Sequence, residues 1–320
     1  MRNEKYFFSF LVVLFFFFLL FSYPTNKLSE DKLYQKQFNE KYKIFAINKP
    51  KNLKFCNEDM NLKSEDIWER MDKELLINTY WQSNTMLYLK RANKYFPVIE
   101  PILEANNIPN DFKYLAVIES GLDDVISPSG AAGFWQILEG TAREYGLEVN
   151  SDIDERYNLE KSTKVACLYL QKAFDKFGSW TMAAASYNLG QNGAIKKIQH
   201  QSTNNYYNLH LNNETSRYIF RIVAVKEILK NPRKYGFVFR DKDLYVMSKY
   251  KVIELDSTIA NLNDFAISHG INLKLLKQYN PWLRTSYLPD KSRKRYILKI
   301  PTDTSLLVFE DFENLELKED

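Results

Sequence analysis

The sequence contains few residues that interrupt a helix. Only 10 glycines and 10 prolines occur among its 320 residues, and these are the two residue types that most disfavour a helix interior. Between them run long segments in which apolar side chains recur every three to four residues, which is the spacing of one helix face. We therefore expect a mainly α-helical protein, whose length allows about two domains.

Periodicity and capping residues predict where the helices lie. Ser64 stands just before Ile67, Met71 and Leu75, an arrangement typical of an N-capped amphipathic helix. The next helix is expected to end before Pro97, because proline disrupts a helix interior. This helix is expected at about residues 85–95. The helices expected after it cover about 110–120, 139–146, 160–177, 179–189 and 214–230.

The first 24 residues have the pattern of a targeting segment. Arg2 and Lys5 precede a run from Tyr6 to Phe21 that is apolar except for Ser9. A helix of this length spans about 24 Å, which is less than the ~30 Å hydrocarbon core of a bilayer. We expect a cleaved signal peptide or a short membrane anchor in residues 6–21, and hence an exported protein of the periplasm or cell envelope.

Charge points to an anionic polymer as partner. The segment between the first 24 residues and the acidic tail (residues 304–320) has more Lys and Arg than Asp and Glu. Export and the lack of a recognition motif argue against nucleic acid, whereas a cell-wall polymer with free carboxylates fits both features. The sequence has no phosphate-binding glycine motif and only three histidines, so we expect no nucleotide, metal or other cofactor.

Glu119 is the candidate for acid–base chemistry. It follows Phe112 and Leu115 at seven and four residues, so it shares their apolar helix face, and Gly121 ends that helix just after it. Burial and the negative end of the helix dipole both raise the pKa of a carboxyl at this position. A carboxyl that stays protonated near neutral pH is what a general acid requires, although a terminal Glu can also rotate into solvent.

A loop of small residues and a later helix end add groups that suit a sugar ligand. The stretch from Ser127 to Gln136 is rich in Gly, Ala and Ser, so its backbone can approach a ligand closely. Trp135 is expected to offer a flat face to a sugar ring, and Gln136 to hydrogen-bond an N-acetyl group. The helix that ends at Gly190 presents Tyr and Asn just before its end.

Four motifs in order resemble one enzyme family. They are Glu119-Ser120, Gly130-Ala-Ala-Gly-Phe-Trp-Gln136, Ser186-Tyr-Asn-Leu-Gly190 and Glu214-Thr-Ser-Arg-Tyr-Ile219. Their order and rough spacing, over about residues 65–237, resemble the lysozyme-like (SLT-type) lytic transglycosylases, and the chain is similar to the membrane-bound lytic murein transglycosylase D group. The resemblance implies a lysozyme-like catalytic domain over residues 64–240, including an N-terminal helical extension.

The resemblance also implies a role for each motif residue. Glu119 would be the single catalytic acid and base, which cleaves the β-1,4 bond between N-acetylmuramic acid and N-acetylglucosamine and leaves a 1,6-anhydro end. The implied substrate-binding residues are Ser127, Gln136, Tyr187, Asn188, Glu214 and Tyr218. Two alternatives stay open: a muramidase that uses water with Asp123 or Asp124 as second carboxylate, and a non-catalytic peptidoglycan-binding protein.

The remaining segments form a smaller module and two polar ends. Residues 243–303 show the order strand, helix, helix, strand, and their sequence resembles a LysM-type glycan-binding repeat. Whether this module binds glycan or only supports the catalytic domain is open at this point. Residues 25–63 are polar and weakly periodic, which indicates a tether or loosely packed arm, and we expect the acidic tail to be disordered.

Overall fold

The computed structural model describes residues 29–41, 44–289 and 294–303. The apolar run of residues 6–21 and the acidic tail lie outside these ranges, so the expectations about them concern residues that are not described. From Ile47 onward the chain forms one compact unit, separate from the residues that precede it. Within the described residues of the preceding part, helix α2 (Glu30–Lys41) has no buried residue. Among the described residues, none of the helices has the length and apolar character needed to cross a membrane.

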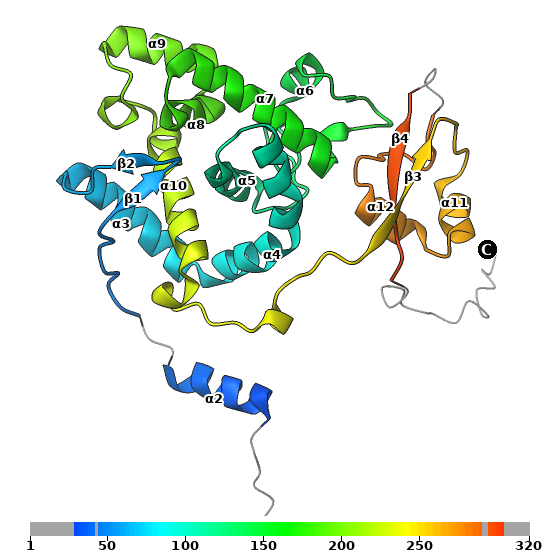
Figure 1. Cartoon of the computed structure of the whole chain (residues 1–320), viewed down its shortest axis with the longest axis horizontal. Coiled ribbons are helices and arrows are strands. Elements are labelled where there is room, and N and C mark those ends of the chain that lie inside the picture. Colours follow the sequence, from blue (N-terminus) through cyan, green and yellow to red (C-terminus); the bar gives the residue numbers. More distant parts are fainter. Residues whose placement is uncertain (1–28, 42–43, 290–293, 304–320) are drawn as a thin grey trace, which may run out of the picture. The chain divides into compact units, whose positions relative to one another are not determined.

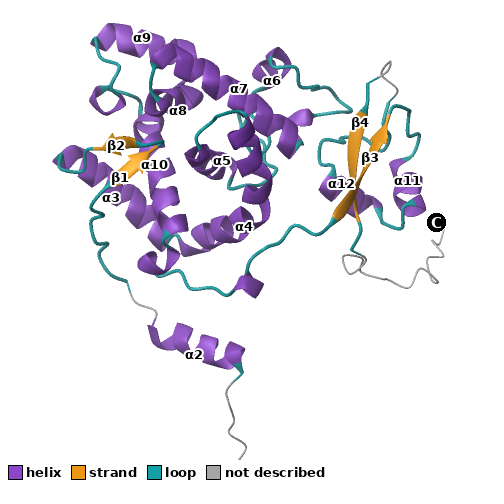
Figure 2. Ribbon diagram, viewed as in Figure 1, coloured by secondary structure: helices purple, strands orange, loops and turns teal. Residues whose placement is uncertain are grey.

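The compact unit is mainly helical, as predicted, and one short helix lies in its centre (Figures 1 and 2). This central helix is α5 (Lys113–Ser120), whose residues from Tyr114 to Ile118 are all buried. Its apolar surroundings come from helices that contact it on several sides, because a helix that is apolar all round must be covered by others. The helices that build the domain around it are α3 (Glu65–Tyr80), α4 (Gln82–Ala105), α6 (Glu139–Glu144), α7 (Leu159–Phe177), α8 (Trp180–Leu189), α9 (Gln191–Gln201) and α10 (Asn213–Lys230).

Most helix boundaries follow the sequence prediction, but α4 does not. The helix continues through Pro97 and Pro101 to Ala105, so the boundary expected before Pro97 is wrong. A proline in a helix interior costs about 3 kcal/mol. The helix beyond the prolines buries Ile99 and Leu103 completely, and each fully buried aliphatic side chain contributes about 1.5–3 kcal/mol. Burial of these two side chains, together about 3–6 kcal/mol, therefore offsets much of the cost of the two prolines. Helix α9 was not expected from the sequence.

A small hairpin corrects the expectation that residues 25–63 are loosely packed. Strands β1 (Leu53–Phe55) and β2 (Glu58–Met60) pair antiparallel, and Leu53, Phe55 and Met60 are buried in the main apolar core. Three apolar residues among many polar ones gave too weak a period for a strand to be predicted. The hairpin also contacts α10, so the core of the helical domain begins before Ser64.

The C-terminal module has the predicted order of elements. Strand β3 (Tyr250–Leu255) pairs antiparallel with β4 (Tyr296–Pro301), with Val252 opposite Lys299. Helices α11 (Leu262–Ser268) and α12 (Leu273–Tyr279) lie between the strands in sequence. The order strand, helix, helix, strand is thus confirmed for the described residues of this module.

The hairpin supplies a testable contribution to the helix that carries Tyr187. Glu58 accepts hydrogen bonds from the backbone N–H of Trp180 (2.6 Å) and Thr181 (3.0 Å) and from the Ser179 hydroxyl (2.8 Å) at the N-terminus of α8. Charged acceptors at a helix N-terminus stabilise it. We predict that Glu58→Ala lowers the free energy of unfolding by about 2 kcal/mol in urea titrations. Asp59→Ala on the same hairpin, which removes an exposed pair with Lys54, should change it by less than about 0.5 kcal/mol.

Candidate active site

Glu119 lies in the last turn of α5, and its position is set by the helix end. Gly121 follows in the left-handed conformation (φ +66°), and its N–H donates to the Val117 carbonyl at 2.8 Å. The Glu119 side chain is half-buried, and one of its carboxyl oxygens accepts a hydrogen bond from the Tyr218 hydroxyl of α10. Two helices that are distant in sequence therefore hold one carboxyl group between them.

The surroundings of Glu119 favour its protonated form. Burial raises its pKa from the ordinary 4.5 to about 7, with the Glu214 charge acting in the same direction. The Tyr218 hydrogen bond and the Arg221 charge oppose this shift, because both favour the ionised carboxylate. The sequence predicted the direction and its main cause. A carboxyl with a pKa near 7 can donate a proton and later accept one at neutral pH.

Arg221 and Ser120 help to place Glu119, although the sequence analysis gave them no role. The Arg221 guanidinium donates to the Ile118 carbonyl at 3.1 Å. Arg221 follows Tyr218 by three residues, so both lie on the same face of α10, and this spacing is a signal that could have identified it. The Ser120 hydroxyl donates to the Phe134 carbonyl at 2.9 Å, which ties the end of α5 to the loop that follows.

The small-residue loop, defined here as residues 125–137, is held by its own backbone and by Gln136. The N–H of Ser127 donates to the Ala131 carbonyl at 2.8 Å, and the Ser127 hydroxyl accepts from the Ala131 N–H. Gln136 has a positive φ (+47°), and its amide nitrogen donates to the carbonyls of Val125 (3.0 Å) and Gly133 (2.9 Å). The side-chain nitrogen of Gln136 thus bonds to carbonyls of the loop itself. The sequence had led us to expect a bond from this side chain to a ligand instead.

Trp135 corrects the expectation of a flat aromatic face for sugar. It is fully buried, and its indole N–H donates to the Thr163 hydroxyl at 2.8 Å. The loop turns inward at Gly133 (φ +75°), where an added Cβ would lie 2.2 Å from the Arg156 carbonyl oxygen. The contact of Trp135 with Tyr187 is made by its backbone, whose carbonyl accepts a hydrogen bond from the Tyr187 hydroxyl at 2.7 Å.

The ends of α8 and α10 meet beside Glu119. The charge of Glu119 raises the pKa of the buried Tyr187 hydroxyl further above its usual value, after burial as the main cause. Asn188 joins the two helices, because its amide nitrogen donates to Glu214 at 2.8 Å and its oxygen accepts from the Thr215 hydroxyl at 2.7 Å. The structure thus connects the residues expected at the site: Glu119, Gln136, Tyr187, Asn188, Glu214 and Tyr218, with Ser127 at the far end of the loop.

Neither loop aspartate is among the charges that shift the pKa of Glu119, although burial raises the pKa of Asp124 itself to about 7. Asp123 is exposed and pairs with Arg91 at 2.7 Å, and it also accepts from the Asp124 N–H. The charges that act most strongly on the pKa of Glu119 belong to Arg221 and Glu214. Within the described ranges, no three His, Cys, Asp or Glu side chains lie together as metal ligands.

Comparison with known proteins identifies two domains. The sequence model described as the transglycosylase SLT domain matches residues 97–210, and the one described as the soluble lytic transglycosylase C-terminal LysM-like domain matches residues 251–304. The first match contains Glu119, Ser127, Gln136, Tyr187 and Asn188 and ends before Glu214 and Tyr218.

Curated relatives extend this similarity. The chain is 28% identical over 232 residues to the membrane-bound lytic murein transglycosylase D of two Escherichia coli strains, K12 and O6:H1, which covers 71% of this chain and 50% of theirs. The chain therefore spans about half the length of the curated relatives it matches. Among solved structures, the 70 kDa soluble lytic transglycosylase of Escherichia coli is similar at 16% identity with a TM-score of 0.38, over 63% of this chain and 40% of that one.

The raised pKa of Glu119 predicts how stability depends on pH. The folded state holds this carboxyl at a pKa of about 7 instead of 4.5, so its ionisation disfavours folding. The resulting loss of free energy of unfolding is absent below pH 4.5, grows between pH 4.5 and 7, and has its full size above pH 7. Because Gln cannot ionise, we predict that Glu119→Gln gains up to about 3 kcal/mol in free energy of unfolding relative to wild type between pH 4 and pH 8.

Urea titrations at the two pH values check this prediction. The matched control is Glu104→Gln, since Glu104 is exposed at the end of α4; its difference from wild type should hardly change with pH. A Glu119→Gln difference that is equally independent of pH would contradict the buried, protonated carboxyl.

Proposed function

Since the chain carries an SLT transglycosylase domain followed by a C-terminal LysM-like domain, we propose that it is a lytic transglycosylase of peptidoglycan. It cleaves the β-1,4 bond between N-acetylmuramic acid and N-acetylglucosamine and forms 1,6-anhydromuramic acid ends, which makes it a lyase acting on a polysaccharide. The observation that carries the proposal is Glu119, a half-buried carboxyl with a pKa of about 7 that is hydrogen-bonded by Tyr218.

In the first step Glu119 acts as general acid. It donates its proton to the bridging oxygen, and the bond from this oxygen to the anomeric carbon of N-acetylmuramic acid breaks. The acetamido group of the same sugar stabilises the positive charge that develops on that carbon. The Tyr218 hydroxyl and Arg221 then stabilise the Glu119 carboxylate that remains, since both favour its ionised form.

In the second step the same carboxylate acts as general base. It takes the proton from the C6 hydroxyl of the N-acetylmuramic acid, and the C6 oxygen forms a bond to the anomeric carbon, which closes the anhydro ring. An attacking group on the substrate itself has a high effective concentration, so no second protein carboxylate is required. Hydrolysis by the usual retaining or inverting route needs two carboxyl groups at set separations.

The residues around Glu119 are proposed to hold the glycan and the carboxyl. Tyr187 and Asn188 face the bond that is cleaved, and Glu214 closes the site from α10. Gln136 and Ser127 shape the loop whose backbone approaches the sugar, a role supported by their hydrogen bonds within that loop. In this arrangement the side-chain nitrogen of Gln136 holds the loop by hydrogen bonds, and the loop backbone then contacts the sugar.

We also propose that the protein works in the cell envelope. The charged start and apolar run of residues 1–24 have the pattern of an export signal or short anchor, and two of the curated relatives are described as membrane-bound. Peptidoglycan glycan strands are the proposed partner, in agreement with the basic character of the chain between residues 25 and 301.

The direct test is the activity of Glu119→Gln on purified sacculi. Gln has almost the same shape but can neither donate nor accept the proton, and each role contributes roughly 10²–10⁴-fold. We predict that release of soluble fragments falls by at least about 10²-fold while the variant stays folded.

Two matched variants separate the proposal from the muramidase alternative. Asp123→Asn and Asp124→Asn each remove one of the two carboxylates that this alternative names as its second group, and each variant should retain most of the activity. If either variant is folded, binds glycan and is as inactive as Glu119→Gln, the single-carboxyl reaction is refuted and a hydrolytic muramidase takes its place.

A further inference from the structure

One short hairpin of the catalytic domain makes backbone hydrogen bonds to the LysM-like module. We call residues 148–156 the docking hairpin; its N–H of Asp154 donates to the Trp282 carbonyl at 2.9 Å, and the N–H of Arg284 donates to the Asp152 carbonyl at 2.9 Å. Between them Ile153 and Leu283 form an antiparallel bridge. The module thus pairs with this hairpin by backbone hydrogen bonds, in the manner of an added strand.

Apolar packing and ion pairs reinforce this junction. Ile153 is fully buried and belongs to the same apolar cluster as the core of the module. Glu148 accepts hydrogen bonds from Lys294 at 2.7 Å and from the Tyr296 hydroxyl at 2.9 Å, and Lys299 pairs with Glu160. Partial burial acts to raise the pKa of Glu148, but these hydrogen bonds and one from Asn150 outweigh it and lower the pKa to about 2.

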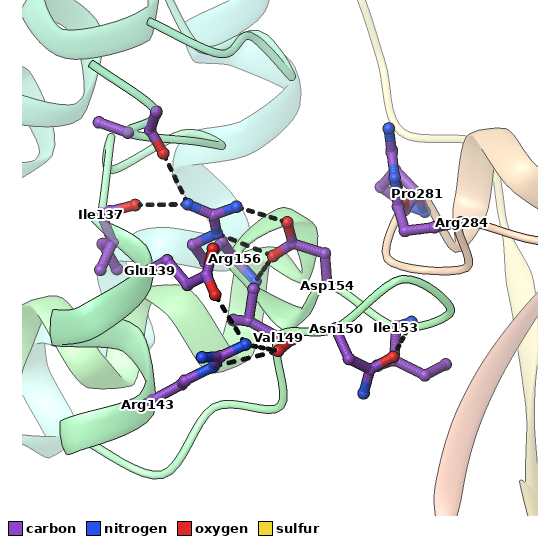
Figure 3. A network of polar contacts seen from close by, with 12 residues as sticks. Ile137, Glu139, Arg143, Val149, Asn150, Ile153, Asp154, Arg156, Pro281 and Arg284 are labelled. Carbon is purple, nitrogen blue, oxygen red and sulfur yellow. Dashed lines mark hydrogen bonds and ion pairs between the residues drawn. The ribbon is translucent and has the colours of Figure 1, made fainter.

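The other side of the docking hairpin holds the small-residue loop (Figure 3). The buried guanidinium of Arg156 makes two bonds to the carboxylate of Asp154, at 2.9 and 2.7 Å, and donates to the carbonyls of Gly130 (2.8 Å) and Ile137 (3.3 Å). Such a two-pronged pair fixes the direction of the guanidinium. The two accepting carbonyls belong to the two sides of the loop, so Arg156 keeps them together.

A continuous set of contacts therefore runs from the module to the active site. Trp282 pairs with Asp154, Asp154 orients Arg156, and Arg156 holds the loop that carries Gln136. The loop also supplies the Trp135 carbonyl that accepts from the Tyr187 hydroxyl. Glu119 is placed separately, by α5 and Tyr218.

We propose that the LysM-like module positions the glycan-binding loop, with Asp154 and Arg156 as positioning residues, so that docking of the module sets substrate affinity. This inference rests on the proposed function only for its kinetic consequence. The positioning itself concerns the order of residues 125–137 and can be measured without any activity.

The two most deeply buried aromatic residues of the module have a structural role. Trp282 and Tyr296 are the large aromatic side chains most deeply placed in the described part of the module, at 3% exposed each. Their rings stack on each other with centroids 5.6 Å apart. Both serve the interior and the junction, so neither presents a face to a sugar.

The test reverses the charges that dock the module. Lys294→Glu/Lys299→Glu places carboxylates against Glu148 and Glu160 and leaves the loop untouched. The matched control is Lys251→Glu/Lys274→Glu, which makes the same charge change at two exposed positions of the module. Hydrogen exchange is followed at the amides of Asp154 and Arg284, which report docking, and of Ala132, Gly133 and Ile137, which are hydrogen-bonded within the loop.

We expect the docking amides and the loop amides to exchange faster together in the double variant and to stay protected in the control. KM should rise about tenfold, with a smaller change in kcat, because the loop positions the sugar and Glu119 carries the chemistry. This rise should appear both on sacculi and on a tetrasaccharide of alternating N-acetylglucosamine and N-acetylmuramic acid. If the double variant stays docked, the experiment is repeated with Ile153→Asp, which places a carboxylate in the apolar junction.

Two results would overturn the inference. Loop amides that keep their protection when the docking amides lose it would show that the module does not hold the loop. A rise of KM on sacculi alone would show that the module binds glycan in its own right. If the proposed function is wrong, the wild-type protein does not cleave the glycan. Hydrogen exchange in the double variant and its control would still follow the expected pattern.

Discussion

The site depends on a carboxyl group that is partly removed from water and still hydrogen-bonded. Glu119 lies in the last turn of a short helix whose residues from Tyr114 to Ile118 are buried, so the centre of the domain fixes the position of its backbone. Burial favours the protonated form, and the Tyr218 hydroxyl and Arg221 limit that effect. The balance leaves the group able to exchange a proton near neutral pH. The helices around α5 serve this arrangement, since α10 supplies both Tyr218 and Arg221.

The second element of the site is a loop that is held both by its own residues and by a residue outside it. Its turns are closed by Ser127 and Gln136, and its outer edge rests on Arg156, which is itself held by Asp154. Because both charges of this buried pair have well-placed partners, the pair has the satisfied geometry that burial of charge requires. Loop and module thereby become parts of one compact unit.

Much of this could be predicted from the sequence, and the failures have identifiable causes. Helix positions and the raised pKa of Glu119 follow from local periodicity and from the order of apolar residues on one helix face. The helix boundary predicted before Pro97 was wrong, because the helix beyond it is stabilised by burial of Ile99 and Leu103, which depends on residues distant in sequence. It failed at Trp135 because the inward turn at Gly133 depends on the close approach of Arg156. The docking of the module could not be predicted, since its contacts join residues more than a hundred positions apart.

The claim that one carboxyl is both acid and base is tested most directly by the mass of the glycan ends. Purified sacculi are digested with the wild-type protein, and the released fragments are weighed by mass spectrometry. Ring closure by the C6 hydroxyl predicts 1,6-anhydro ends, which are one water lighter than reducing ends. Fragments that carry only reducing ends would contradict it, because water would then have attacked the anomeric carbon.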